Sequence, residues 1–196
     1  MTVPSSNRSR LVCRASNYFA GLASVLRTHR GILFPYTPTI NYDVSVNYTP
    51  YNLTHTNYTF YSYGGTNSPN LQLTAQFSTT TDVEHRYTRG VLHFLRSVTK
   101  MYYGLNEGTP SAGTPPPVLR FSSHGAQIFN NVPVVVTNFA STFDDNIDMV
   151  TYDGISLPAI MVISIGMGVT VSPDKQKLQF SKSSFISGNA YSQGFI

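Results

Sequence analysis

The residues from Thr81 to Gly104 form the one stretch of this chain whose pattern is clearly helical, and they constrain the fold most. Thr81 and Glu84 stand at the spacing of a capping box, in which hydroxyl and carboxylate satisfy backbone donors of the first turn. Apolar residues then recur every three or four positions along one face: Tyr87, Val91, Phe94, Leu95, Val98, Met101 and Tyr102. Gly104 is suited to end the helix because glycine adopts the left-handed conformation. A helix with one apolar stripe needs one apolar sheet to cover it.

The segments on both sides of this helix alternate apolar and polar residues, which is typical of β-strands with one buried face. Residues 41–49 place four apolar side chains on the predicted buried face, namely Tyr42, Val44, Val46 and Tyr48. Residues 71–78 do the same with Leu71, Leu73, Ala75 and Phe77. Further strands are predicted at residues 118–123, 132–139, 147–152 and 157–172. The fold class is therefore predicted to be mainly β, with one flanking α-helix at about residues 82–103.

Residues 55–63 differ from the other predicted strands because aromatic side chains occupy both faces. Tyr58 and Phe60 fall on one face, and Tyr61 and Tyr63 fall on the other. A strand of this kind needs cover on both sides. Only 11% of the residues in the chain are charged, which leaves large neutral surfaces and favours assembly. We therefore expect a neighbouring subunit to cover this strand.

The 196 residues divide by composition into three parts. Residues 1–30 are predicted to be a basic arm containing a short helix, and their arginines are Arg8, Arg10, Arg14, Arg27 and Arg30. The absence of acids in this part also fits an organellar presequence, but we favour an arm that orders against a neighbouring subunit. Residues 31–173 form the β-domain. Residues 174–196 form a polar tail, whose apolar end, Gly194 to Ile196, has no evident partner in a monomer.

Basic residues line the face of the predicted helix opposite its apolar stripe, and we call them the basic ridge: Arg86, Arg89, His93, Arg96 and Lys100. One interpretation is a solvated face that keeps the domain soluble, and the other is a docking surface for an acidic partner. The most acidic segment of the chain is a predicted turn that holds Asp144, Asp145 and Asp148. We predict that the basic ridge meets the acidic turn of an adjacent copy across a subunit boundary.

Residues suited to catalysis or metal binding are scarce. The histidines include no pair at the spacing of a zinc helix, and Cys13 is the only cysteine, so neither a zinc site nor an internal disulfide is expected. The sequence contains no nucleophile elbow and no phosphate-binding glycine loop. The acidic turn offers oxygen ligands for a hard cation, although a solvated turn is the commoner outcome. We predict no catalytic residues, no cofactor and no metal.

Five motifs follow one another in residues 31–173: NYTFYSYGG, a polar-faced strand ending at Thr80, DVEHRYTRGVLHFLRSVTKMYYG, GTPPPVLRF and NVPVVVTNF. This order resembles the tube-type proteins at the baseplate end of contractile phage tails, in particular the baseplate tail-tube cap proteins of T4-like phages. The most specific pieces are HFLRSVTKMYYG, TPPPVLRF and NVPVVV. Residues 1–30 and the tail after Pro173 match nothing in that family, and the chain is shorter than those cap proteins.

The resemblance implies a two-sheet β-domain with one flanking helix, six copies of which join their sheets into a ring-shaped barrel around a channel. The residues expected to face this channel are Ser45, Asn47, Gln72, Thr74 and Gln76. Their neutral polar side chains would let DNA pass without specific binding, whereas a lumen of Lys and Arg would hold it. The implied protein is a virion component assembled in the host cytoplasm. Its implied partners are the tail tube, the baseplate hub and, as a further candidate, the sheath, with no membrane.

Three alternatives to a tube-initiator or tube-cap ring remain open at this point. An ordinary tail-tube shaft subunit would have the same fold and would differ in copy number. A nucleic-acid-binding module is motivated by the basic ridge and the basic first thirty residues, although the neutral strands argue against it. A hydrolase is motivated only by carboxylates such as Asp144 and Asp148, and no spacing supports a matched acid and base.

Overall fold

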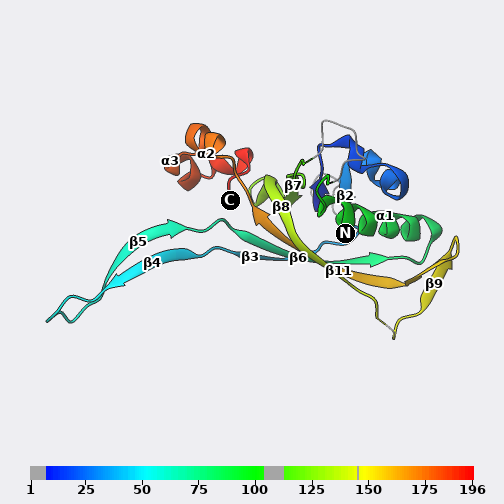
Figure 1. Ribbon diagram of the computed structural model, residues 1–196, viewed down its shortest axis with the longest axis horizontal. Helices are drawn as coiled ribbons and strands as arrows, with labels where there is room; N and C mark the ends of the chain where they lie inside the picture. Colours follow the sequence, from blue (N-terminus) through cyan, green and yellow to red (C-terminus); the bar gives the residue numbers. More distant parts are fainter. Residues whose placement is uncertain (1–7, 104–112, 145) are drawn as a thin grey trace.

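One antiparallel sheet organises the chain. Within residues 8–103, 113–144 and 146–196, which the computed structural model describes, seven strands pair in the order β2-β1-β7-β8-β11-β6-β3 (Figure 1). They are β1 (Arg10–Val12), β2 (Gly31–Leu33), β3 (Thr39–Asp43), β6 (Asn70–Ser78), β7 (Leu119–Ser123), β8 (Phe129–Thr142) and β11 (Ile160–Val169). Strands β2 and β3 form the two edges of this sheet, so the described part of one chain contains no closed barrel.

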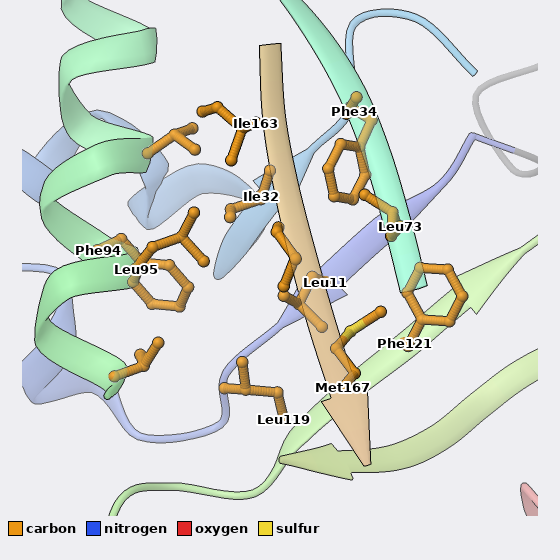
Figure 2. Close-up of a cluster of buried hydrophobic side chains, with 14 of the residues drawn as sticks. Leu11, Ile32, Phe34, Leu73, Phe94, Leu95, Leu119, Phe121, Ile163 and Met167 are labelled. Atoms are coloured by element: carbon orange, nitrogen blue, oxygen red, sulfur yellow. The ribbon is translucent and has the colours of Figure 1, made fainter. Parts of the chain in front are cut away.

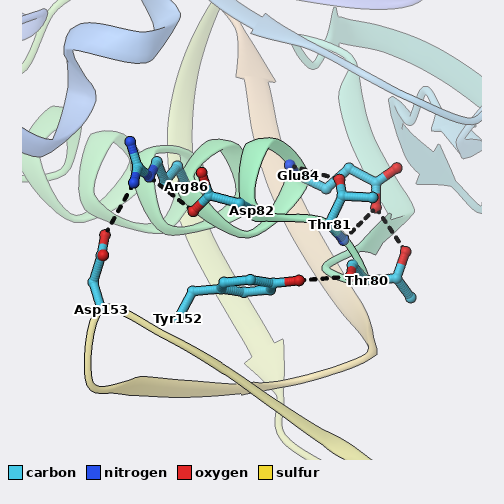
Figure 3. A network of polar contacts seen from close by, with 7 residues as sticks. All are labelled: Thr80, Thr81, Asp82, Glu84, Arg86, Tyr152 and Asp153. Carbon is cyan, nitrogen blue, oxygen red and sulfur yellow. Dashed lines mark hydrogen bonds and ion pairs between the residues drawn. The ribbon is translucent and has the colours of Figure 1, made fainter.

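Two hairpins extend beyond the sheet. Strands β4 (Val46–Tyr51) and β5 (Phe60–Thr66) pair only with each other in the described chain, and they continue outward from β3 and β6 as a long projection (Figure 1). We call residues 46–66 the arm. The second hairpin, β9 (Met149–Tyr152) with β10 (Ile155–Pro158), lies beside the first turns of the long helix (Figures 1 and 3).

The long helix α1 (Asp82–Val98) covers one face of the sheet and forms the core with it. Strand β6 alternates as predicted, with its apolar residues buried: Leu71, Leu73, Ala75 and Phe77. The neighbouring β11 buries Met161, Ile163, Ile165 and Met167 on the same face. Figure 2 shows Phe94 and Leu95 pointing from α1 toward this layer. The prediction of a mainly β fold with a flanking helix is therefore confirmed.

The start of α1 is the predicted one, but its end is not. Thr81 is the N-cap, and the capping box is complete, because the Glu84 backbone N–H donates to Thr81 Oγ1 at 3.3 Å and the carboxylate of Glu84 accepts from the Thr81 N–H. The helix ends at Val98, earlier than Gly104, which lies outside the described residues. The Thr99 hydroxyl donates to carbonyl groups of the last turn, which otherwise lack partners there.

The predicted N-terminal arm is wrong for residues 8–30, because these residues belong to the core of their own chain. Leu11 on β1 is fully buried, and so are Phe19 and Leu26 around and within the 3-10 helices η2 (Ser16–Tyr18) and η3 (Gly21–His29). The Phe19 ring stacks on Phe94 of α1 with centroids 5.5 Å apart. The prediction failed because β1 pairs with β7, about a hundred residues away, and the residue pattern within 1–30 cannot predict such a distant partner.

The C-terminal tail also differs from its prediction, because its apolar end is buried within the chain. Residues 173–193 form three short helices: α2 (Pro173–Gln179), α3 (Lys182–Ile186) and the 3-10 helix η5 (Asn189–Gln193). Phe195 packs edge-on against Phe180, with centroids 5.4 Å apart, and Lys175 lies over its other side. Gly194 approaches the backbone of Asn131 so closely that a side chain would collide with it. Gly194 and Phe195 thus hold the C-terminal helices against β8.

Candidate functional site: the open face, the arm and two charged surfaces

Along strands β6, β11 and β8, the face of the sheet opposite α1 is polar and carries almost no charge, and we call this part the open face. On β6 it presents three of the predicted channel residues, Gln72, Thr74 and Gln76, between the buried apolar ones. The strand register places Ser164 of β11 beside Thr74, and their hydroxyls are 3.3 Å apart. The strict alternation of β6 thus produces a neutral hydrogen-bonding surface of amides and hydroxyls.

Glycine keeps the centre of the open face flat. Gly166 of β11 lies between Gln72 of β6 and Asn138 of β8. A Cβ at Gly166 would collide with the side-chain amide of Asn138, which lies across this position. The sheet hydrogen bonds shift register here, between Gly166 and Met167. The result is a shallow hollow of amide groups, with Asp43 as the one carboxylate among its lining residues in the described chain.

Ser45 and Asn47, also predicted to face the channel, lie away from this part of the sheet, at the base of the arm. Asn67 joins them, because its side chain donates to Ser45 Oγ at 2.8 Å and accepts from the Asn47 amide at 3.1 Å. The predicted buried strand over residues 41–49 is therefore wrong. Its apolar residues Tyr42, Val44, Val46 and Tyr48 are 40% to 55% exposed. The apolar and polar residues do alternate along this segment, but no second layer of the described chain packs against the apolar side chains.

The arm presents aromatic side chains on both faces, as the sequence predicted. The register places Tyr48 opposite Tyr63, with an edge-to-face ring contact at 5.8 Å, and Tyr51 opposite Phe60. Pairs two residues apart along a strand share a face, so Tyr61 joins the face of Tyr63. Exposed large apolar residues of the arm are Val46, Tyr48, Tyr51, Leu53, Tyr58, Phe60, Tyr61 and Tyr63. An apolar surface of this kind marks a site of interaction.

The basic ridge lies along the solvent side of α1. Arg86, at its first end, pairs with Asp82 at 2.9 Å and with Asp153 at 3.5 Å (Figure 3). Asp153 comes from the turn between β9 and β10, so the ion pair between Asp153 and Arg86 links this hairpin to α1. The remaining members, Arg89, His93, Arg96 and Lys100, form no ion pair with the described residues. The charges of Arg89, Arg96 and Lys100 are therefore available for contacts with another molecule.

The acidic turn connects β8 to β9, and its described aspartates, Asp144 and Asp148, form no ion pair with the basic ridge. Asp144 and Asp148 are exposed, while Asp145 lies outside the described residues. The Asp144 carboxylate accepts from the backbone N–H of Asn146 at 3.0 Å, which stabilises the turn. The predicted meeting of ridge and turn across a subunit boundary stays a prediction.

A third charged surface was not predicted, and we call it the arginine hollow. It has a volume of about 370 Å³, and its lining residues are Arg10, Val12, Arg14, Thr28, His29, Arg30, Arg120, Ser122 and Asn131. Three of these arginines come from the basic first thirty residues, whose lack of acids was the only signal in the sequence. Arg120 joins them because β7 pairs with β1. Partial burial and the neighbouring Arg14 lower the pKa of Arg120.

The described chain holds no cluster of metal ligands, and its free cysteine is buried. No three His, Cys, Asp or Glu residues within it lie close enough to hold a metal ion. Cys13 is a buried free thiol, and burial raises its pKa, which keeps it in the unreactive protonated form. None of the described helices combines the length and the apolar character needed to cross a membrane.

Comparison with known proteins yields structural likeness without any match in sequence. No protein-family model and no curated protein matches this chain. Among solved structures, it is similar to a chain in the tail of an empty GTA particle with C6 symmetry. The two are 7% identical, the alignment covers 88% of this chain and 96% of that chain, and the TM-score is 0.38. A likeness of this extent assigns neither a family nor a function to the present chain.

Proposed function

We propose that this chain is a structural protein of a phage tail. In this proposal, six copies form a tube-initiator or tube-cap ring that joins the baseplate hub of a contractile tail to the tail tube and surrounds the DNA channel. The observation that carries the proposal is the arm, whose two aromatic faces have no cover in the described chain. The motifs that resemble baseplate tail-tube cap proteins support the same role.

The arm requires a partner for physical reasons. An isolated two-stranded hairpin is at best marginally stable in water, and it needs a third layer or strand against its apolar side chains. Tyr61 is 67% exposed and Tyr63 is 60% exposed, so neither face of the hairpin gains from burial in the monomer. A neighbouring subunit that covers these rings would supply the missing burial, at about 25 cal/mol for each Å² of apolar surface.

The open face and the sheet edge fit a ring. Strand β3 pairs with β6 on one side and leaves its other side without a strand in the described chain. Exposed edges of this kind are prone to pair with another chain, and closed symmetry removes them. If β3 joins a neighbouring sheet, the neutral groups of Gln72, Thr74 and Gln76 extend around a common lumen. The ring would be part of the virion, assembled in the host cytoplasm, with no enzymatic role.

An ordinary tail-tube shaft subunit is the second candidate. The same arm and open face would serve it, because a shaft is a stack of similar rings. Copy number separates the two, since an initiator or cap contributes one ring to each tail. Labelling of this chain in intact particles would show either one position at the baseplate end or a signal along the whole tube. Sheath and hub contacts would follow from that position.

The test of the assembly proposal uses the arm. Because the Asn67 N–H donates to the Ser45 carbonyl at 2.9 Å, residues 46–66 can be replaced by an Asn-Gly turn without stretching the base. We expect the wild-type chain to form six-membered rings in native mass spectrometry and electron microscopy, and the shortened chain to fold but stay monomeric. A finer variant, Tyr61→Ser with Tyr63→Ser, keeps the backbone and should weaken assembly at least tenfold.

The matched control changes the opposite face of the same hairpin. Thr49 and Ser62 are paired there, so Thr49→Ala with Ser62→Ala alters polar groups and leaves the aromatic rings in place. This control should assemble like the wild type. Rings from the shortened chain, or a wild-type chain that stays monomeric at every concentration and in the presence of its tail partners, would contradict the proposal.

A further inference from the structure

The arginine hollow gathers positive charge from segments far apart in the sequence. Arg10 begins β1 and Arg14 follows it, Arg30 precedes β2, and Arg120 lies on β7. Leu11 and Phe121 are buried on the helix side, so their neighbours Arg10 and Arg120 point to the opposite side of the sheet. The hollow therefore belongs to the same side as the open face, at the β1–β7 end.

The charge of the hollow is not compensated. The ion pairs of the described chain involve Arg86 on α1, and none joins an arginine of the hollow to a carboxylate. No Asp or Glu is among the lining residues. Outside the lining, partial burial and then repulsion by the nearby Arg120 lower the pKa of Lys175. Four guanidiniums held together in this way favour an anion, whose binding would relieve their mutual repulsion.

The donors at the floor of the hollow are held in place. Arg120 Nη1 donates to the carbonyl of Asn131 at 3.3 Å, and the Asn131 N–H donates to Ser122 Oγ at 3.0 Å. Asn131 itself has a left-handed backbone, with φ of 53°. Ser122 accepts in this contact, so its hydroxyl hydrogen is free to donate to a ligand. Fixed donors lose little freedom when an anion binds.

We propose that the arginine hollow binds the phosphate groups of nucleic acid, without sequence preference. Guanidinium groups match phosphate oxygens in two-pronged contacts, which makes arginine the preferred residue for this ligand. An acidic segment of protein is the less suitable occupant, because Val12 is the only aliphatic side chain in the lining and a protein segment needs apolar burial to dock. This inference goes beyond the proposed tail role, because it assigns a phosphate-binding site to a chain whose open face is neutral.

The binding would depend steeply on salt. If each of the four arginines neutralises one phosphate of a duplex, the logarithm of the binding constant should fall against that of salt with a slope of about −3.6. Arg10 and Arg14 are both exposed, so their removal should not disturb the core. In Arg10→Ala with Arg14→Ala, we expect the slope to fall to about −1.8 and the affinity at low salt to drop at least tenfold.

The experiment uses the full chain with a fluorescein-labelled DNA duplex across a salt series. The matched control, Lys177→Ala with Lys182→Ala, removes the same charge from exposed positions outside the hollow and should keep the wild-type slope. Equal losses in the two variants would overturn the proposal, because net charge alone would then explain binding. A wild-type chain that binds a peptide of residues 141–151 but not DNA would overturn it as well, since the hollow would then be a protein-docking site.

The same samples separate this inference from the assembly proposal. Native mass spectrometry without DNA reports ring formation, whereas the salt series reports phosphate binding. Rings without DNA binding would refute the phosphate site and leave the tail role standing. A monomer that binds DNA with the expected slope, and loses it in the Arg10→Ala and Arg14→Ala variant, would support the site and refute the ring.

Discussion

At the scale of single residues, His85 is the buried polar group that the rest of the structure explains least. Its side chain is fully buried under the β9–β10 hairpin, where its ring meets Tyr152 edge-on at a centroid distance of 5.4 Å. Neither ring nitrogen has a hydrogen-bond partner in the described chain. A buried polar atom without a partner loses its hydration and gains nothing in return. His85 therefore contributes through its shape and its ring contact.

We predict that His85→Phe stabilises the protein, because phenylalanine keeps the ring and removes the unpaired nitrogens. The free energy of unfolding in urea should rise by about 1 kcal/mol. His93→Phe on the exposed side of α1 is the control, and it should bring no gain. A loss of stability in His85→Phe would mean that the nitrogens are paired in solution, for example with a bound water.

At the scale of elements, the start of α1 is held by a carboxylate that several hydroxyls stabilise. Ser78 and Thr80 each donate to Glu84 Oε2 at 2.9 Å, and Figure 3 shows the contact from Thr80. The hydrogen bond from Ser78, and next that from Thr80, lower the pKa of Glu84 below 4.5, despite an opposing effect of desolvation. The folded state thus holds fewer protons than the unfolded state as the pH falls below 4.5. The contribution is present at neutral pH and is lost as the pH drops through the folded pKa.

Glu84→Gln should isolate this charge, because glutamine preserves the capping-box geometry but does not titrate. We expect the variant to melt below the wild type at pH 7 and the difference to shrink as the pH falls through the folded pKa of Glu84. Thr81→Ala removes the cap itself, and it should cost about 1 kcal/mol throughout this pH range. A constant difference between Glu84→Gln and the wild type over this range would exclude the charge as the cause.

At the scale of the whole molecule, the surfaces differ sharply in character. The arm is aromatic, the open face is neutral, and charge is concentrated in the basic ridge, the arginine hollow and the acidic turn. Complementary charges at an interface mainly steer encounter and fix register. Arg86 already has partners in Asp82 and Asp153, so the residues available to another subunit are Arg89, Arg96 and Lys100.

We predict that Arg89→Glu with Arg96→Glu weakens ring assembly, more so at low salt, where repulsion is less screened. Each exposed pair contributes only about 0.2–1 kcal/mol, so monomer stability should barely change. Asp144→Lys with Asp148→Lys in the same chain should restore part of the loss if the acidic turn of a neighbour is the partner. Sedimentation at two salt concentrations measures both effects, with Lys177→Glu and Lys182→Glu as the charge-matched control.

The outcomes have distinct meanings. Normal assembly of the Arg89→Glu and Arg96→Glu variant at low salt would show that the basic ridge is a solvated face. Weakened assembly without rescue would point to an acidic partner other than this turn.

The sequence by itself determined the features that depend on neighbours a few residues away. The capping box fixed the start of α1, and strict alternation identified the buried and open faces of β6 and β11. Composition also determined that Gln72, Thr74 and Gln76 form a neutral surface. These features follow from backbone periodicity, which any window of the chain contains.

Only the tertiary structure decided which segments share a sheet. Residues 41–49 and 71–78 alternate equally well, yet only β6 has its apolar side buried, under α1. Strand β3 pairs with β6 at the edge of the sheet and stays largely exposed, and β4 projects in the arm. Pairing of β1 with β7 placed Leu11 in the core and Arg120 beside Arg14. Such contacts join residues about a hundred positions apart, and no local pattern specifies them. The helix and the central strands of the core could therefore be predicted from the sequence, whereas the part of the core supplied by residues 8–34, the sheet edges and the arginine hollow depend on long-range pairing.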